Sequence, residues 1–227
     1  MAEEKFQSHG EMSLAHYGVL FLDEILEFKR ELLELMRGPL EDSKVTISRI
    51  SNTITYPCDF MLIASMNPCP CGYYGSQDKE CTCSVDQITK YINKLSGPLL
   101  DRIDIHIEVQ SVKYKDLSNT TKNESSKDIK KRVNAARALQ LSRYKNDGIH
   151  SNAQLTSVLI NKYCILSKEC KDLLEIAFNK LKLSARAHER ILKLARTIAD
   201  LDQSETIKIN HLAEAIQYRS LDRKYWG

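Results

Sequence analysis

The stretch Gly18-Val19-Leu20-Phe21-Leu22-Asp23-Glu24 places four apolar residues directly before two carboxylates. A short apolar run of this kind is typical of a buried strand in a parallel sheet. Residues that follow such a strand face the crevice in which open α/β sheets bind their ligands. In nucleoside triphosphatases an aspartate at this position holds Mg²⁺ through water, and the next glutamate polarises the attacking water. The alternative is structural: two acids that open a helix and suit the positive end of its dipole.

A second apolar run, Phe60-Met61-Leu62-Ile63-Ala64, ends in the polar stretch Ser65-Met66-Asn67. It predicts another strand of the same sheet. Because the carboxyl ends of parallel strands meet at one edge of a sheet, we expect Asn67 to lie beside the two acids. An amide there can orient a nucleophilic water or contact a terminal phosphate. Alternatively, Asn67 only forms the turn before Pro68.

The residues between these two runs predict a helix and a β-hairpin. Apolar side chains recur near helical spacing over residues 24–37, and Gly38-Pro39 is expected to end that helix. Residues 45–57 alternate between apolar and polar side chains, which is typical of a hairpin. The basic side chains Lys44 and Arg49 accompany this hairpin, which comes directly before the second strand.

Four of the seven cysteines form two short arms, Cys69-x-Cys71 and Cys81-x-Cys83. The other three are scattered along the chain. Without a secretory signal, paired cysteines favour metal ligands over disulfides. Four thiolates on two arms can close a tetrahedral Zn²⁺ site, which would be structural because the protein fills all four positions. The alternative is four free cysteines in a loop.

The segment after the cysteines predicts a helix and a third strand. Ser84 and Gln87 form a capping box for a helix that runs to about Lys94. Residues 103–109 predict a strand, and Arg102 comes directly before it. A single arginine at such a position is usually a surface residue.

Charge divides the chain into two parts. Residues 1–111 contain 10 basic and 17 acidic side chains, whereas residues 112–227 contain 23 and 13. The basic part could face a polyanion, or its charges could simply cover solvated helix faces. Apolar residues make up 42% and charged residues 28% of the chain, and no apolar run approaches the ~20 residues of a membrane span. We therefore expect a cytoplasmic globular protein without a membrane segment.

Beyond a polar linker, the C-terminal part predicts a small helical bundle. Its helices have apolar residues at helical spacing and polar residues that can cap their first turns. The predicted caps are Ser126, Ser167, Ser184 and Asn210.

Several stretches together resemble the YifB/ComM group of the magnesium-chelatase-like AAA+ ATPases. The likeness covers nearly the whole chain from about Gly10. It rests on GEMSLAHYGVLFLDE (10–24), MNPCPCG (66–72), LSGPLLDRID (95–104), LSARAHERIL (183–192), ARTIADL (195–201) and HLAEAIQYR (211–219).

The resemblance implies roles for the hydrolytic residues. Asp23 and Glu24 would be the Walker B pair, and Asn67 would be sensor 1. Arg102 would be the arginine finger, which reaches the nucleotide of a neighbouring subunit in a ring. A fixed guanidinium there would neutralise charge that develops on the γ-phosphate.

The resemblance also implies lid and pore residues. Arg186 would be the sensor 2 arginine, with Arg190 as the second candidate one turn later. The hairpin at 45–57 occupies the place of the pre-sensor-1 hairpin, which touches nucleic acid in ring helicases of this branch. Lys44 and Arg49 would then contact phosphates, although an ordinary charged surface hairpin is equally compatible with the sequence.

The implied fold is α/β: the C-terminal part of an AAA+ parallel-sheet core with a β-hairpin insert, followed by an all-α lid domain. We expect residues 1–111 to form the core part, 112–127 a linker and 128–227 the lid. The family's phosphate-binding Gly-x-x-x-x-Gly-Lys-Ser/Thr loop does not occur in these 227 residues. We therefore expect the sequence to be the C-terminal part of a longer protein and to bind ATP weakly by itself.

Three functions are compatible with the sequence. The first is part of a hexameric AAA+ ring motor that uses ATP and Mg²⁺ to remodel DNA, as in branch migration during recombination or natural transformation. The second is a non-catalytic, zinc-stabilised DNA-binding or assembly module. The third is a chelatase-type motor for metal insertion, against which the four-cysteine cluster counts.

Overall fold

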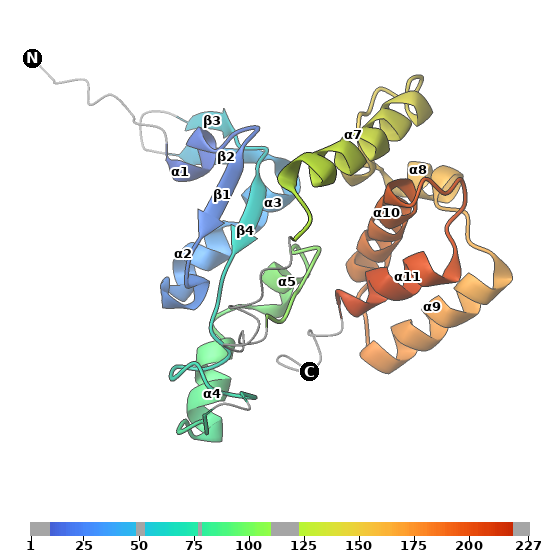
Figure 1. Cartoon of the computed structure of the whole chain (residues 1–227). Coiled ribbons are helices and arrows are strands. Elements are labelled where there is room, and N and C mark those ends of the chain that lie inside the picture. Colours follow the sequence, from blue (N-terminus) through green and yellow to red (C-terminus); the bar gives the residue numbers. More distant parts are fainter. Residues whose placement is uncertain (1–9, 49–52, 77–78, 110–122, 220–227) are drawn as a thin grey trace, which may run out of the picture. The chain divides into compact units, whose positions relative to one another are not determined.

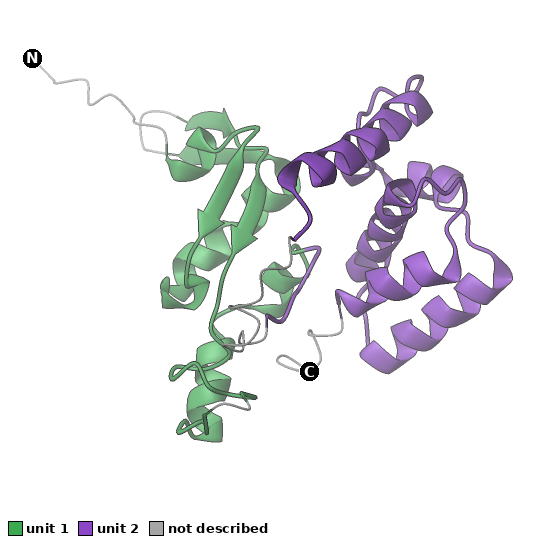
Figure 2. Ribbon diagram, viewed as in Figure 1, with its two compact units in different colours: residues 1–103, 226 green, residues 104–225, 227 purple. Residues whose placement is uncertain are grey.

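The computed structural model describes residues 10–48, 53–76, 79–109 and 123–219. The chain divides into two compact units, one formed by residues 1–103 and the other by residues 104–225 (Figure 2). The predicted linker at 112–127 falls mostly on residues 110–122, outside the described residues, so the predicted domain boundaries stay a prediction. No helix in the described ranges combines the length and apolar composition that a membrane crossing requires.

The first unit contains the predicted parallel pair of strands. Strand β1 (Val19–Leu22) pairs with β4 (Met61–Ala64), with Val19 opposite Met61 and Leu22 opposite Ala64 (Figure 1). This register brings the residues that follow both strands to the same sheet edge, as we expected. The same unit contains α1 (Glu11–Leu14), η1 (Ile25–Glu27), α2 (Arg30–Leu35), α3 (Arg37–Asp42), α4 (Val85–Ile92) and α5 (Gly97–Leu100).

The single helix predicted over residues 24–37 is wrong. Phe28 and Lys29 are extended, so the chain breaks into η1, α2 and α3. The break lets Ile25 and Leu26 become fully buried from a short 3-10 turn. Gly38-Pro39 does not end a helix but lies in the first turn of α3, where a missing N–H costs no hydrogen bond.

The predicted hairpin is confirmed by β2 (Lys44–Ser48) and β3 (Thr53–Pro57), which pair antiparallel. Its two faces differ, because side chains alternate along each strand. The apolar side chains are half-buried, and the opposite face is exposed and rich in hydroxyls, with the Thr46 and Thr55 Oγ1 atoms 2.9 Å apart.

The strand predicted at residues 103–109 is wrong, because none of these residues lies in a strand. A strand needs a partner for its backbone groups, and in the described residues the β1–β4 sheet has no third member. The apolar residues Ile105, Ile107 and Val109 are exposed instead.

The second unit is helical throughout its described elements. Helix α10 (Ala185–Leu201) packs against α7 (Ser126–Arg143), α8 (Ser157–Tyr163) and α11 (Ile209–Gln217), and α11 packs against α9 (Lys168–Leu181). A further 3-10 turn, η2, spans Asn152–Gln154. Buried aliphatic residues from these elements form one core.

Two of the four predicted caps in this unit are confirmed. Ser167 and Ser184 accept backbone N–H groups of α9 and α10 at 3.3 and 3.1 Å. Helix α7 is capped by Ser125, one residue before the predicted cap. Helix α11 begins after Lys208, so the predicted Asn210 cap is wrong. The Lys208 N–H donates to His211 Nδ1 at 3.1 Å, so a ring nitrogen in the first turn takes the place of that cap.

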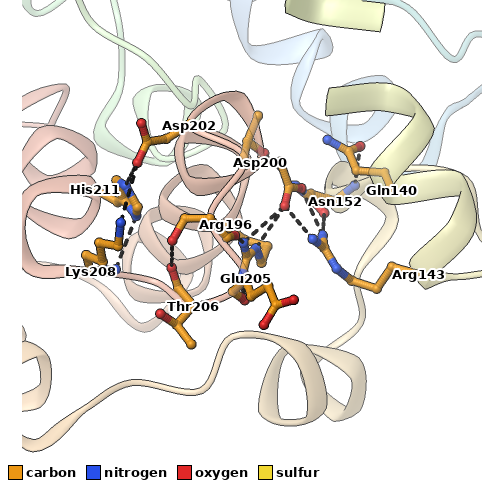
Figure 3. Close-up of polar contacts among 12 residues, drawn as sticks. Gln140, Arg143, Asn152, Arg196, Asp200, Asp202, Glu205, Thr206, Lys208 and His211 are labelled. Atoms are coloured by element: carbon orange, nitrogen blue, oxygen red, sulfur yellow. Dashed lines mark hydrogen bonds and ion pairs between the residues drawn. The ribbon is translucent and has the colours of Figure 1, made fainter. Parts of the chain in front are cut away.

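A buried polar network ties three elements of this unit together (Figure 3). The Asp200 carboxylate is 0% exposed and accepts hydrogen bonds from Arg143 Nη1 at 2.8 Å, Asn152 Nδ2 at 2.9 Å and Arg196 Nε at 3.1 Å. Asn152 also accepts from the Tyr144 hydroxyl at 2.6 Å. The network therefore links α7, η2 and α10 through one satisfied buried charge.

Candidate functional site

Asp23 and Glu24 occupy the turn directly after β1. Glu24 adopts a left-handed backbone conformation, with φ 49° and ψ 52°. Non-glycine residues rarely adopt this region, and such residues concentrate at functional sites. Both carboxylates are exposed to solvent, as ligand-binding groups must be.

Ser65, at the end of β4, holds this turn in place. Its hydroxyl accepts the Glu24 N–H at 3.0 Å and donates to Asp23 Oδ1. Its carbonyl accepts the Ile25 N–H at 2.9 Å. Ser65 is a site residue without a role predicted from the sequence. Its position in the sequence could have predicted this role. A hydroxyl that directly follows β4 lies beside the acid that directly follows β1, because the two strands pair in parallel.

The structure also brings Asn67 to these acids, because Asn67 Nδ2 lies 3.5 Å from Glu24 Oε1. Asp23, Glu24, Ser65 and Asn67 thus form one exposed polar cluster at the carboxyl edge of the parallel pair. Two carboxylates, a hydroxyl and an amide form a donor set suited to a hydrated Mg²⁺ and to an ordered water.

Arg102 belongs to the same unit but contacts other groups. It lies just after α5, with a side chain that is 7% exposed. Its Nη1 donates to the Pro98 carbonyl at 2.6 Å, and its Nη2 forms an ion pair with Glu41 in α3. These contacts hold the guanidinium against residues of the first unit.

The two predicted lid arginines lie on α10, in the second unit. Arg186 is exposed in the first turn of the helix. Arg190 forms an ion pair with Asp104, which belongs to the same unit. The role of both toward a nucleotide stays a prediction.

The predicted DNA contacts lie on or beside the β2–β3 hairpin. Lys44 is exposed at the start of β2, opposite Pro57. Arg49 lies outside the described residues. Their role in binding phosphates also stays a prediction.

The four paired cysteines converge at one point of the first unit. The Sγ atom of Cys69 lies 3.4 Å from that of Cys71 and 3.7 Å from that of Cys81, and the Cys71 and Cys81 Sγ atoms are 3.6 Å apart. All four Sγ atoms, including that of Cys83, lie within 4.8 Å of one another. Disulfide sulfurs are about 2.05 Å apart, whereas the sulfurs of a tetrahedral site with 2.3 Å Zn–S bonds are roughly 3.8 Å apart. The spacing is therefore that of a metal site.

The surroundings favour the thiolate at Cys71 and disfavour it at Cys81 and Cys83. The Tyr74 N–H points to Cys69 Sγ at 3.3 Å. The backbone N–H groups of Tyr73 and Thr82 lower the pKa of Cys71 to about 5. Burial and the neighbouring thiols raise the pKa of Cys83. Four thiols this close cannot all ionise by themselves, and a divalent cation would remove that conflict.

Comparisons with known proteins agree with this architecture. Residues 3–117 match the family model for the magnesium chelatase subunit ChlI, and residues 123–219 match the model for its C-terminal region. The chain is 46% identical over 215 residues to "Uncharacterized protein YifB" of Escherichia coli K12. It is 44% identical over 216 residues to "Competence protein ComM" of Haemophilus influenzae.

Each of these two alignments covers 94% of the chain and 41% of the relative, so the chain spans about two fifths of the length of the curated relatives it matches. Together, the two family models match the chain on both sides of the boundary between its compact units. The chain therefore belongs to the magnesium-chelatase-like family of AAA+ proteins that the ChlI models describe.

Proposed function

We propose that this chain is part of an AAA+ ATPase ring motor in which ATP hydrolysis is coupled to DNA remodelling. The observation that supports the hydrolytic part is the placement of Asn67 Nδ2 3.5 Å from Glu24 Oε1, at the carboxyl edge of the β1–β4 pair. The two strands are separated by 38 residues in the sequence, and their pairing brings these polar groups to one point. A turn with only a structural role does not require this arrangement.

In this proposal each polar residue has a distinct task. Asp23, oriented by the Ser65 hydroxyl, would hold Mg²⁺ through water, and the cation would neutralise phosphate charge. Glu24 would orient the attacking water and receive its proton. Asn67 would donate to that water or to the γ-phosphate. Phosphoryl transfer depends mostly on positioning and charge stabilisation, which is what these groups can supply.

The proposal extends to the ring and to the DNA substrate. In the ring, Arg102 would leave Glu41 and contact the nucleotide of a neighbouring subunit. Arg186 and Arg190 would reach the nucleotide from the helical unit. The basic C-terminal part and the exposed hairpin with Lys44 and Arg49 would face DNA phosphates. The name of the ComM relative, a competence protein, points in the same direction. The protein would act in the cytoplasm as a hexamer.

Glu24→Gln in the complete gene product tests the hydrolytic assignment. Because the amide cannot accept a proton, we expect ATP turnover to fall by about 10²- to 10⁴-fold while ATP binding is retained. Glu31→Gln, an exposed glutamate of α2, is the matched control and should leave turnover unchanged. Normal turnover in the Glu24 variant would remove Glu24 from the mechanism. DNA effects that persist in that variant without hydrolysis would favour the non-catalytic binding module.

We also propose that Cys69, Cys71, Cys81 and Cys83 hold one structural Zn²⁺. The support is the spacing of the four sulfurs and the N–H groups directed at them. Metal analysis of the purified chain should give about one equivalent of zinc, and Cys81→Ser should release it. Cys170→Ser, which removes a buried thiol of the helical unit, should leave the zinc content unchanged. Less than about half an equivalent in the unaltered chain would contradict this assignment.

A further inference from the structure

Helix α4 connects the cysteine cluster to the turn that holds Glu24. The helix begins at Val85, two residues after Cys83. A capping box fixes this start: Ser84 Oγ accepts the Gln87 N–H at 3.3 Å, and Gln87 Oε1 accepts the Ser84 N–H at 2.8 Å. Cys83 therefore lies directly before a helix start that is fixed by its own cap.

Lys94, two residues beyond the end of α4, contacts η1, which directly follows the Asp23-Glu24 turn. Lys94 Nζ donates to the Leu26 carbonyl, two residues beyond Glu24. The same ammonium lies 5.4 Å from the centre of the Tyr91 ring. Tyr91 is only 7% exposed, and burial and the carboxylates of Glu27 and Glu24 raise the pKa of its phenol.

The cluster reaches Asn67 by a second and shorter route. Cys69 follows Asn67 by two residues, and Pro68 between them has a fixed φ angle. Cys69 is fully buried and accepts the Tyr74 N–H through its sulfur. A bond that holds Cys69 in place therefore also restricts the positions that the Asn67 amide can adopt.

We propose that metal binding by the four cysteines positions the hydrolytic site, through Pro68 to Asn67 and through α4 and Lys94 to Leu26 in the segment that follows Glu24. This inference rests on the proposed function of Glu24 and Asn67. One metal ion joins residues 69 and 83 and closes the loop between them, which removes conformational freedom from both routes. Lys94 is a positioning residue, since it acts on the segment after Glu24 and not on the reacting atoms. A displacement of about 1 Å at a site of this kind costs about 100-fold in rate.

Hydrogen–deuterium exchange on this chain, with zinc bound and after chelation, tests the coupling without any hydrolysis. The reporting amides are those of Glu24 and Ile25, which donate to Ser65 at 3.0 and 2.9 Å. We expect chelation to speed exchange about tenfold or more over residues 23–27 and 61–68, as well as within 69–84. Peptides from α9 and α10 should not change. Faster exchange confined to residues 69–84 would overturn the proposal.

A kinetic experiment on the complete gene product separates the two routes. Lys94→Met removes the bond to Leu26, and we expect about a tenfold loss of kcat with KM for ATP within about twofold and zinc content unchanged. Lys90→Met, on the exposed side of α4, should behave as the unaltered protein. An unchanged kcat in Lys94→Met would remove the α4 route.

The outcomes of these experiments distinguish the inference from the function on which it rests. If Glu24→Gln leaves turnover normal while chelation still loosens residues 23–27, the hydrolytic role of Glu24 is wrong and only the mechanical link stands. If Glu24→Gln abolishes turnover and chelation leaves those residues protected, the function stands and the positioning role of the metal is wrong.

Discussion

Ser65 shows how one hydroxyl can organise a pair of acids. It accepts the Glu24 N–H and donates to the Asp23 carboxylate, so it restrains both residues at once. The left-handed backbone of Glu24 is uncommon for a residue with a side chain and needs such support. Asn67 then lies within reach of the Glu24 carboxylate. Four polar side chains are thereby arranged at one sheet edge, with Ser65 half-buried and the other three exposed.

Ser65→Ala should therefore impair hydrolysis without unfolding the protein. Loss of the bridging hydroxyl frees Asp23 to rotate, and we expect kcat of the complete gene product to fall about tenfold. The Mg²⁺ concentration that gives half-maximal turnover should rise, because Asp23 would hold the cation. Ser48→Ala, which removes an exposed hydroxyl of the hairpin, is the control. Unaltered magnesium dependence in Ser65→Ala would contradict the role assigned to Ser65.

At the scale of elements, prediction succeeded where the determinants are local. The capping box of α4 and the serine caps of α9 and α10 were predicted because each cap lies within three residues of the N–H that it accepts. The helix at 24–37 and the strand at 103–109 were wrong, because burial and strand partners from distant residues decide them. The Asp200 network was missed for the same reason: Arg143 lies 57 residues before Asp200.

The Asp200 network should dominate the stability of the helical unit. Asp200→Asn keeps the side-chain volume but leaves the buried guanidinium of Arg196 without a counter-charge. Breaking a buried ion pair in this way costs about 3–5 kcal/mol of unfolding free energy. Urea unfolding followed by far-UV circular dichroism measures it. Asp172→Asn, at an exposed position of α9, should stay within about 0.5 kcal/mol of the unaltered chain, and a similarly small loss in Asp200→Asn would contradict the prediction.

For the whole molecule, the first unit presents surfaces that suit an assembly. Phe21 is 58% and Met61 63% exposed, although both lie on strands of the parallel pair. Apolar patches of this kind are typical of surfaces that another polypeptide segment covers. In the proposed ring, each hydrolytic site also needs Arg102 from the neighbouring subunit, so no subunit would hydrolyse ATP alone.

Mixing two inactive variants of the complete gene product tests this shared site. Arg102→Ala subunits keep Glu24, and Glu24→Gln subunits keep Arg102. Neighbours in a cyclic assembly contact each other head to tail, so each site takes Glu24 from one subunit and Arg102 from the next. In a ring assembled at random from equal amounts of the two variants, about one interface in four therefore combines an intact Glu24 with an intact Arg102. We expect ATP turnover to recover to about a quarter of the normal rate. A mixture as inactive as its two components would place Arg102 outside its neighbour's site.

The sequence by itself determined that the apolar runs ending at Leu22 and Ala64 form strands followed by polar residues, that Ser84, Ser167 and Ser184 cap helices and that four cysteines are paired. These features depend on neighbours within a few residues, and they carry the family resemblance from which the roles of Asp23, Glu24 and Asn67 are proposed. Only the tertiary structure decided that Ser65 bridges the acids, that the four sulfurs lie at the spacing of a metal site, that Lys94 holds the turn after β1 and that Asp200 binds three elements together. Each of these contacts joins atoms across a strand pairing, a closed loop or a helix packing, and the geometry of such contacts exists only once the chain has folded.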